Sequence, residues 1–414
     1  MWSILYVVSS VLAMSSSLDS SDLCPEDVEP CTCEGFLTFM YLSCSKFDNM
    51  SQVQRVLRTF PSPIAHLTIT HDSIGLTSDA FQDVCIRRLV LQLKQLSEIP
   101  DPLFLNQANC LYFLSITEGS LQEIPINSLL PLHELATLSI SNNRISEVKE
   151  SLRQLNLITL VLNNNSLSRI DSRAFPLNLK SLSLSDNHIE NLNGSLIHLT
   201  QLEWLILSNN NIKSLNDELA NFNSLNMLLL GRNKLENLDN SLHNLSKLEI
   251  LDLSENRITT LNHNFIGLDS LFKLNLSRNL LTQINEDEFE PLIDLKILDL
   301  SRNQFNTLGN SLRLLKKLRI LNLNGNNLVK MDASFDCLNV LKVLNLSHNI
   351  IQNLDFLNPN RTDHHHHPEC QFRNQNSLKI MDISENPLEC TPSVEPIVLR
   401  LKLKNAIIEG NPCH

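Results

Sequence analysis

Histidines and acidic residues are the side chains in this sequence with the clearest chemical potential. A run from His364 to His367 could bind zinc or copper, because histidine-rich tracts supply imidazole ligands. Adjacent histidines in a loop lack the separated ligands of a structural zinc site, which favours a solvated loop instead. Acidic residues such as Asp252, Glu255 and Asp299 fall at variable positions of a repeating pattern, as residues of a solvated face do. No metal site is therefore predicted.

Motifs typical of enzymes are absent from the sequence. It contains no G-x-S-x-G, no H-E-x-x-H, no P-loop and no G-x-G-x-x-G. With 9 glycines among 414 residues, a phosphate-binding loop is not expected. The sequence predicts a protein without catalytic residues or a cofactor, so binding is the function to look for.

A repeated word must position any binding surface. Leu248, Leu251, Leu253 and Asn256 fill the fixed places of L-x-x-L-x-L-x-x-N. The same word begins at Leu135, Leu157, Leu179, Leu202, Leu225, Leu271, Leu295, Leu318, Leu341 and Leu378. Its starts are 22 to 24 residues apart, except for a last step of 37. A period of about 20–29 residues marks a leucine-rich repeat, whereas a helical protein would show a period of 3–4 without a fixed asparagine.

The predicted fold is an α/β leucine-rich repeat solenoid with a curved parallel sheet on its concave face. Positions one, four and six of the word should stack in the core, and the asparagine should bind backbone groups at the turn. Three worn copies, IAHLTITHD, IRRLVLQLK and LYFLSITEG, place Asp72, Lys94 and Gly119 where asparagine belongs, and bring the count to about 14 repeats. The expected divisions are a signal peptide (1–17), an N-terminal cap (18–62), degenerate repeats (63–134), regular repeats (135–388) with an insertion (357–375), and a reduced C-terminal cap (389–414).

Positions three and five of the word should point onto the concave sheet. On three neighbouring strands they form a contiguous apolar patch, with a charged rim at position eight: Trp204, Ile206, Met227, Leu229 and Ile250, then Arg232, Arg278 and Arg302. Exposed aromatic and methionine side chains are typical of binding surfaces. The alternative is that these residues serve strand propensity and cover one another. Asn275 and Asn345 lie at position five and, if glycosylated, would obstruct the sheet from Leu274 onward.

The compartment follows from the ends of the chain and from its charge. An apolar run from Ile4 to Met14 followed by small residues is typical of a signal peptide, with an uncleaved anchor as the alternative. No later stretch reaches the length of about 18 apolar residues that spans a bilayer. The net charge of −12 disfavours nucleic acid or an anionic membrane as the main partner.

Cysteines and sequons agree with secretion. Cys85 and Cys110 each precede the first position of adjacent repeats, about 4.8 Å apart, so we predict that they pair. Cys337 and Cys370 are predicted to pair and pin the insertion. Seven N-x-S/T sequons are candidate glycosylation sites: Asn49, Asn164, Asn193, Asn244, Asn275, Asn345 and Asn360.

Both ends resemble known caps. The segment CPEDVEPCTCEGFLTFMYLSC resembles the N-terminal cysteine cap of extracellular leucine-rich repeat proteins. Sequence alone allows three pairings of its four cysteines, and the resemblance implies Cys24–Cys33 and Cys31–Cys44. The final segment resembles a shortened C-terminal cap, in which we expect a disulfide between Cys390 and Cys413. There Leu399, Leu401 and Leu403 alternate with basic residues, which predicts a strand.

A narrower resemblance covers roughly residues 24 to 120. The pattern C-P-x4-P-C-x-C, the later Cys44, the run QVQRVLRTFPSPIAHLTI and the degenerate repeats resemble arthropod proteins related to the non-catalytic subunit of shrimp luciferase, a luciferin monooxygenase. The resemblance implies an extracellular subunit without catalytic residues. Toll-like and Slit-like proteins are competing resemblances.

The sequence thus predicts a secreted protein that binds a protein partner through its concave face. Two alternatives stay open: a non-catalytic subunit that stabilises a secreted enzyme, and a recognition protein of innate immunity or adhesion.

Overall fold

The computed structural model describes residues 24–25, 27–36, 39–60, 63–216, 218–331, 335, 337–357, 377–392, 394–403 and 406–412. Several expectations lie outside these residues: the signal peptide, the histidine run from His364 to His367, the sequon at Asn360, and the cysteines Cys370 and Cys413.

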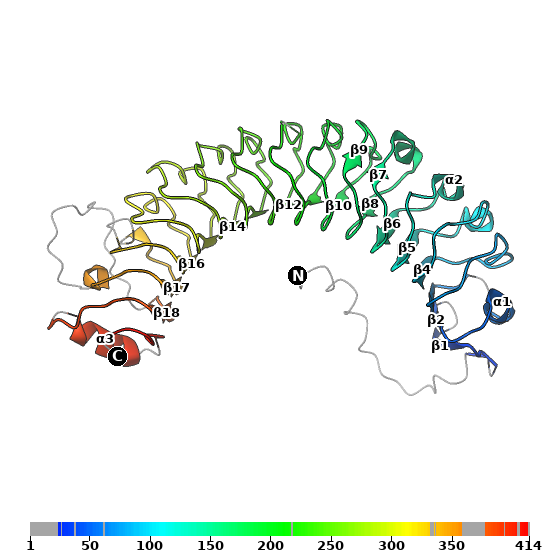
Figure 1. Cartoon of the computed structure of the whole chain (residues 1–414), viewed down its shortest axis with the longest axis horizontal. Helices are drawn as coiled ribbons and strands as arrows, with labels where there is room; N and C mark the ends of the chain where they lie inside the picture. The colour runs from blue at the N-terminus through cyan, green and yellow to red at the C-terminus, as the bar shows by residue number, and fades with distance from the viewer. Residues whose placement is uncertain are drawn as a thin grey trace.

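One sheet of 16 strands lines the inner face of an arc (Figure 1). Strands β1 (Cys31–Phe36) and β2 (Phe39–Cys44) form an antiparallel hairpin at its N-terminal end. The other strands are parallel, one from each predicted repeat: β3 (His66–His71), β4 (Arg88–Leu93), β5 (Phe113–Thr117), β6 (Thr137–Ser141), β8 (Thr159–Val161), β10 (Ser181–Ser183), β11 (Trp204–Ile206), β12 (Met227–Leu229), β13 (Ile250–Asp252), β14 (Lys273–Asn275), β15 (Ile297–Asp299), β16 (Ile320–Asn322), β17 (Val343–Asn345) and β18 (Ile380–Asp382).

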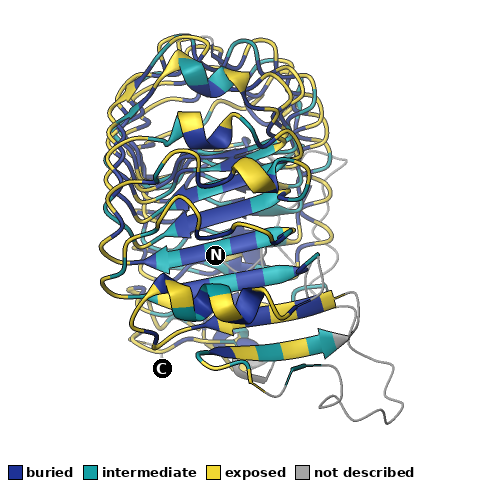
Figure 2. Ribbon diagram, turned by 90° about the vertical axis from the view of Figure 1, so that its right-hand side faces the viewer, coloured by how far each residue is buried: buried dark blue, intermediate teal, exposed yellow. Residues whose placement is uncertain are grey.

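The stacked leucines explain this arrangement. Strand pairing aligns identical positions of successive words, so Leu228 faces Leu251, which faces Leu274. Leu248, Leu251 and Leu253 are fully buried, as positions one, four and six were expected to be. Figure 2 shows the buried strand residues in dark blue beneath one another. Each unit buries its apolar side on its neighbours, which is the source of stability in a solenoid.

The asparagines at position nine form a buried ladder. The side-chain amide of Asn256 donates to the carbonyls of Leu230 and Leu253, both at 3.0 Å. Its Oδ1 accepts the backbone N–H of Leu235 at 3.0 Å. The Leu253 carbonyl also accepts the amide of Asn279 at 2.9 Å, so neighbouring asparagines share an acceptor. The ladder satisfies backbone groups that leave the sheet, as predicted.

The degenerate repeats replace this ladder. Asp72 and Lys94 are exposed and form an ion pair of 2.7 Å between adjacent repeats. Gly119 leaves room for the next asparagine, because a Cβ there would lie 2.6 Å from Oδ1 of Asn143. Oδ1 of Asn143 accepts the backbone N–H of Leu121, a contact that a side chain at residue 119 would obstruct. The degenerate repeats therefore keep the stacked leucines but lack the buried side-chain amides of the asparagine ladder.

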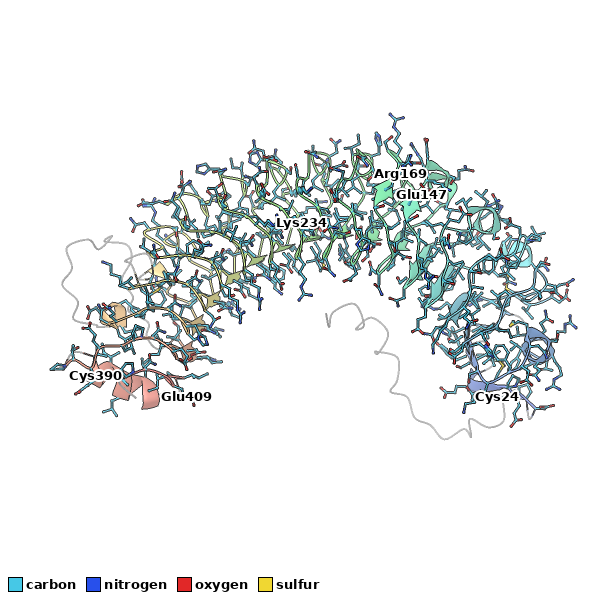
Figure 3. All side chains as sticks on the ribbon, in the orientation of Figure 1. Cys24, Glu147, Arg169, Lys234, Cys390 and Glu409 are labelled. Atoms are coloured by element: carbon cyan, nitrogen blue, oxygen red, sulfur yellow. A yellow bond between two sulfur atoms is a disulfide. The ribbon has the colours of Figure 1, made fainter. Side chains whose placement is uncertain are left out.

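The outer side of the arc is built from turns and short elements (Figures 1 and 3). These are helices α1 (Met50–Leu57) and α2 (Ile126–Leu129), the 3-10 turns Leu105–Gln107, Glu150–Gln154 and Asp355–Leu357, and a two-stranded sheet of β7 (Glu147–Val148) and β9 (Arg169–Ile170). Buried phenylalanines fill the space beneath them. Phe81 stacks on Phe104, and Phe265 on Phe289, with ring centroids 6.3 and 6.1 Å apart.

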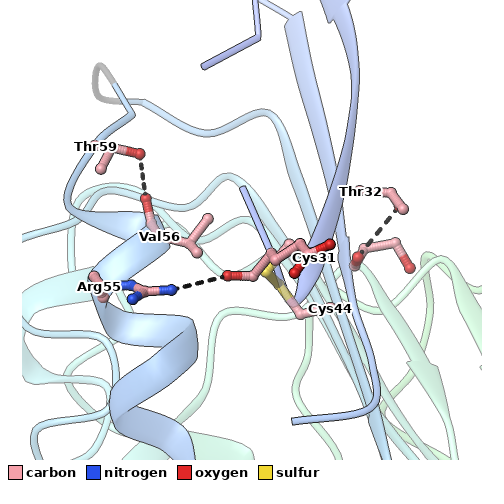
Figure 4. The surroundings of a disulfide bond; sticks show 8 residues. Cys31, Thr32, Cys44, Arg55, Val56 and Thr59 are labelled. Carbon is pink, nitrogen blue, oxygen red and sulfur yellow. Dashed lines mark hydrogen bonds between the residues drawn. A yellow bond between two sulfur atoms is a disulfide. The ribbon is translucent and has the colours of Figure 1, made fainter. Parts of the chain in front are cut away.

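Three disulfides hold the N-terminal end, and they join the three pairs expected there. Cys24 bonds to Cys33 and Cys31 to Cys44 within the cap, and Cys85 bonds to Cys110 across two degenerate repeats. Beside the Cys31–Cys44 bond, the guanidinium of Arg55 on α1 donates to the carbonyl of Glu29 at 3.3 Å (Figure 4). The cap thus seals the first repeat, as a solenoid end requires.

The C-terminal segment corrects one prediction. Residues Glu395–Leu403 form helix α3, where the alternation of leucines predicted a strand. Val394, Val398 and Leu401 are buried, with the spacing of one helical face, whereas Leu399 is 62% exposed. Cys337 and Cys390 are each disulfide-bonded, and their expected partners lie outside the described residues.

Candidate binding surface on the concave face

Strand register places the predicted apolar patch on one face of three strands. Trp204 on β11 lies beside Met227 on β12, which lies beside Ile250 on β13. Ile206 lies beside Leu229 in the next row. These five residues, hereafter the apolar patch, are adjacent because each row holds one position of the word: position three for Trp204, Met227 and Ile250, and position five for Ile206 and Leu229. Parallel strands bring such positions to about one strand spacing, about 4.8 Å.

The apolar patch is accessible rather than covered by its neighbours. The Trp204 side chain is 45% exposed, and Ile206, Met227, Leu229 and Ile250 are half-buried. The patch ends sharply at β14, where Lys273 takes position three and is exposed. On the far side, β6, β8 and β10 carry Thr137, Thr159 and Ser181 at that position, so the patch stands beside a run of small hydroxyl side chains.

The three predicted rim arginines are not equivalent. Arg232 lies just past β12 and forms an ion pair with Glu255, Nε to Oε1 3.3 Å. Arg278 and Arg302 belong to the repeats of β14 and β15, so the structure does not place them beside the apolar patch. All three have a left-handed backbone, with φ of 59°, 55° and 54°. This conformation is strained for most residues other than glycine and asparagine. At the same position, four repeats carry asparagine or glycine (Asn142, Asn164, Asn209 and Gly325), and four carry Asp186, Glu255, His348 and Glu385.

A ladder of Asp and Asn residues covers position five from β13 onward. Oδ1 of Asp299 accepts both the N–H and the hydroxyl of Ser301, at 2.9 and 2.6 Å. The sequon residue Asn345 makes the same contacts with Ser347, at 2.9 and 2.7 Å. Asn275, the other sequon residue of this face, accepts the N–H of Ser277 at 3.1 Å. Both sequon residues are half-buried in the sheet and serve its local structure.

A second cluster at the N-terminal end of the concave face was missed from the sequence. Tyr41 and His66 have ring centroids 5.9 Å apart, and the guanidinium of Arg88 lies 3.8 Å from the ring centroid of Phe113. Burial, and secondarily the charge of Arg88, lower the pKa of His66. Reading position three from the first degenerate word, at Ile64, would have found His66, Arg88 and Phe113, whereas Tyr41 lies on β2 of the cap, outside the repeated words.

Outside the concave face, the described part of the structure has two buried glutamates with raised pKa values and one hollow lined by carboxylates. Burial raises the pKa of Glu218, whose carboxylate accepts the N–H groups of Gly194 and Leu196. Burial also raises the pKa of Glu288. A hollow of about 400 Å³ near Glu147 is lined by several carboxylates, and Lys149 pairs with two of them, Glu123 and Glu147. Among the described residues, no three His, Cys, Asp or Glu side chains could hold a metal ion. No helix in this part of the chain is long and apolar enough to cross a membrane.

Comparison with known proteins agrees with this geometry. A leucine-rich repeat family model matches residues 155–212, 177–235, 223–281 and 273–328. No curated protein sequence matches the chain. A leucine-rich repeat protein of Leptospira interrogans is similar in structure, with 25% identity, a TM-score of 0.70, and coverage of 87% of this chain and 86% of that one.

Two receptor complexes share the fold. The Toll–Spatzle complex of Drosophila matches with 18% identity and a TM-score of 0.72, over 92% of this chain and 58% of the matched one. A TLR13 complex with single-stranded RNA matches with 24% identity and a TM-score of 0.68, over 88% and 56%. The chain thus spans little more than half the length of these two matched chains. The repeated words, the curved sheet of 16 strands and these matches show that the chain folds as a leucine-rich repeat solenoid.

Proposed function

We propose that this chain is a secreted recognition protein that binds a protein partner through the apolar patch. The observation that carries the proposal is the contiguity of Trp204, Met227 and Ile250 on neighbouring strands, with the tryptophan 45% exposed. A buried aromatic anchor surrounded by aliphatic side chains is the usual composition of an interface hot spot. Secretion is supported by the disulfides of the N-terminal end and by the signal-like residues 1–17.

The charges around the apolar patch favour a protein over a nucleic acid. Glu249 is exposed at the margin of β13, and Asp252 follows Ile250 on the same strand. Glu203, beside Trp204, already pairs with Lys180 at 3.0 Å. Carboxylates at this margin would repel a phosphate backbone, whereas they suit a partner that places an apolar anchor between basic side chains.

The test is to produce the mature chain in secreting cells and to identify the proteins that it captures. Trp204→Glu with Met227→Glu should abolish capture of one defined protein, because two carboxylates would be buried against its anchor. Ile266→Glu with Ile293→Glu is the matched control, since both residues are exposed outside the concave sheet and should tolerate the change. Equal capture by the patch variant and the wild type would refute the proposal.

The same experiment addresses the alternative of an enzyme subunit. That alternative rests on the resemblance of residues 24 to 120 to the non-catalytic luciferase-type subunit. A subunit should co-purify with one enzyme in a fixed ratio, whereas a recognition protein should be captured free or with varied ligands. Glycosylation of the exposed sequons belongs to the same proposal, because the modification requires the secretory route.

A further inference from the structure

Four basic residues stack along the margin of the concave sheet at position two of the last four words. Lys296, Arg319, Lys342 and Lys379 directly precede β15, β16, β17 and β18. Backbone hydrogen bonds of 2.8 Å join each to the next, from the N–H of Arg319 to the carbonyl of Lys296 and onward to Lys379. We call these residues the basic lane. Arg319, Lys342 and Lys379 are exposed, and Lys296 is half-buried.

The fold itself does not account for the basic lane. Like charges on adjacent strands repel one another, and here four follow in succession at about 4.8 Å. Among the described residues none of the four forms an ion pair. Asp294 is bound by Lys317, and the hydrogen bond and charge of Lys317, then the charge of Lys296, lower the pKa of its carboxyl. The ammonium of Lys296 lies 5.9 Å from the ring centroid of Phe272. Within the described part of the chain, Arg319, Lys342 and Lys379 are neighbouring cations without an ion pair, and in a protein of net charge −12 such a row points to an anionic ligand.

An aliphatic lane runs beside the basic one. Each basic residue is followed in the chain by an aliphatic residue at position three: Ile297, Ile320, Val343 and Ile380. Their strands are in direct register, and the side chain of Ile380 is 53% exposed. Lys273 separates this aliphatic lane from the apolar patch, so the two surfaces are distinct. The C-terminal half of the arc thus presents parallel charged and apolar lanes.

We propose that this double lane binds an acidic amphipathic α-helix of a partner protein. A helix advances about 5.4 Å per turn, close to the strand spacing of about 4.8 Å, so one turn can meet one repeat over three to four repeats. Residues at i, i+4, i+7 and i+11 would present one carboxylate to each of the four cations, and the neighbouring stripe would present apolar side chains to the aliphatic lane. An extended peptide repeats its side chains every about 6.6 Å on one face, which does not match this spacing.

The proposal constrains one glycosylation site. Asn345 lies two residues beyond Val343 on β17, at position five, directly beside the aliphatic lane. A glycan attached there would stand over the aliphatic lane and exclude a helix. The proposal therefore requires an unmodified Asn345, which peptide mapping of the secreted chain can establish. A glycan at this residue in the native protein would overturn it.

The test uses a synthetic helical peptide of about 15 residues, with one Glu per turn and Leu on the adjacent stripe, against the full chain. The striped peptide should bind, and a scrambled peptide of the same composition should not. Arg319→Glu with Lys342→Glu should weaken binding at least about tenfold, which corresponds to about 1.4 kcal/mol. Raising the salt concentration should weaken it as well, since the basic lane is exposed.

The matched control is Lys247→Glu with Arg257→Glu. Both residues are exposed, and neither forms an ion pair within the described part of the chain. The double substitution changes the net charge by the same amount as the substitution of Arg319 and Lys342. This variant should bind the striped peptide as the wild type does. Three results would overturn the proposal: equal binding of the scrambled peptide, equal loss in the control variant, or binding of heparin without binding of the striped peptide.

Discussion

The asparagine ladder allows a quantitative prediction at Asn256. This side chain is 7% exposed and bridges two repeats through the groups of Leu230, Leu235 and Leu253. The substitution Asn256→Ala removes its donor and its acceptor together. The N–H of Leu235 then loses its partner in a fully buried site, whereas each of the two carbonyls keeps one asparagine donor.

The magnitude follows from that difference. A buried N–H without a partner costs about 1–3 kcal/mol. Each of the two carbonyls accepts hydrogen bonds from two asparagines and loses one of them, with a net value of about 0.5–1.5 kcal/mol. The sum predicts a loss in unfolding free energy of about 4 kcal/mol, within a range of about 2 to 6. Asn256→Asp should be at least as harmful, because it places an anionic oxygen beside the two carbonyls where the amide donated.

Urea unfolding followed by circular dichroism measures the global effect, and amide hydrogen exchange at Leu235 measures the local one. Asn223→Ala is the control, since that asparagine is exposed on a loop between β11 and β12. It should change the unfolding free energy by less than about 0.5 kcal/mol. If Asn256→Ala proves no more destabilising than this control, the ladder does not stabilise the solenoid in the way described.

Three further predictions concern backbone strain, pH and glycans. Arg278→Asn should raise the unfolding free energy by up to about 1 kcal/mol in urea titrations, because asparagine tolerates the φ of 55° better than arginine; a destabilised variant would contradict this reasoning. Since burial raises the pKa of Glu288 in the folded state, ionisation there lowers stability as pH rises through and above the unfolded value of about 4.3. Glu288→Gln should therefore gain melting temperature over wild type at pH 7.5 and lose that advantage near pH 4; an advantage independent of pH would exclude ionisation as its cause. Peptide mapping after glycosidase treatment should find glycans on the exposed sequons and none on the half-buried Asn275 and Asn345. The exposed sequons are Asn49, Asn164, Asn193 and Asn244. The opposite distribution would contradict the role assigned to the position-five ladder.

The repeat period determines how much of the fold the sequence predicts. With every step but the last near 23 residues, the inward positions, the asparagine ladder and the contiguity of Trp204, Met227 and Ile250 all follow from one count. The repeat period makes no prediction where no further repeat follows in the stack. Helix α3 packs against the last repeat rather than inside the stack, so the alternation of Leu399 and Leu401 did not predict its conformation. The helical spacing of Val394, Val398 and Leu401 was the better signal.

Surface features were harder to predict, because they depend on columns that the core does not constrain. The basic lane appears when position two is read down the last four words, and the aromatic cluster near Arg88 appears when worn words are included. The rim arginines show the opposite problem. Their position in the word was correct, but adjacency to the apolar patch depends on which repeat carries them, and Arg278 and Arg302 lie beyond β13.

The two ends of the sheet bear on assembly. A parallel sheet with open edges invites another copy to add its own strand, and such head-to-tail addition does not close and produces fibres. At one end β1 runs antiparallel to β2, so the outermost strand has the wrong direction for a second solenoid to continue the ladder. At the other end Ile407 and Glu409 bond to Ile383 and Glu385 beside β18 and occupy the edge. Loss of either cap should therefore favour head-to-tail association of the chain into filaments.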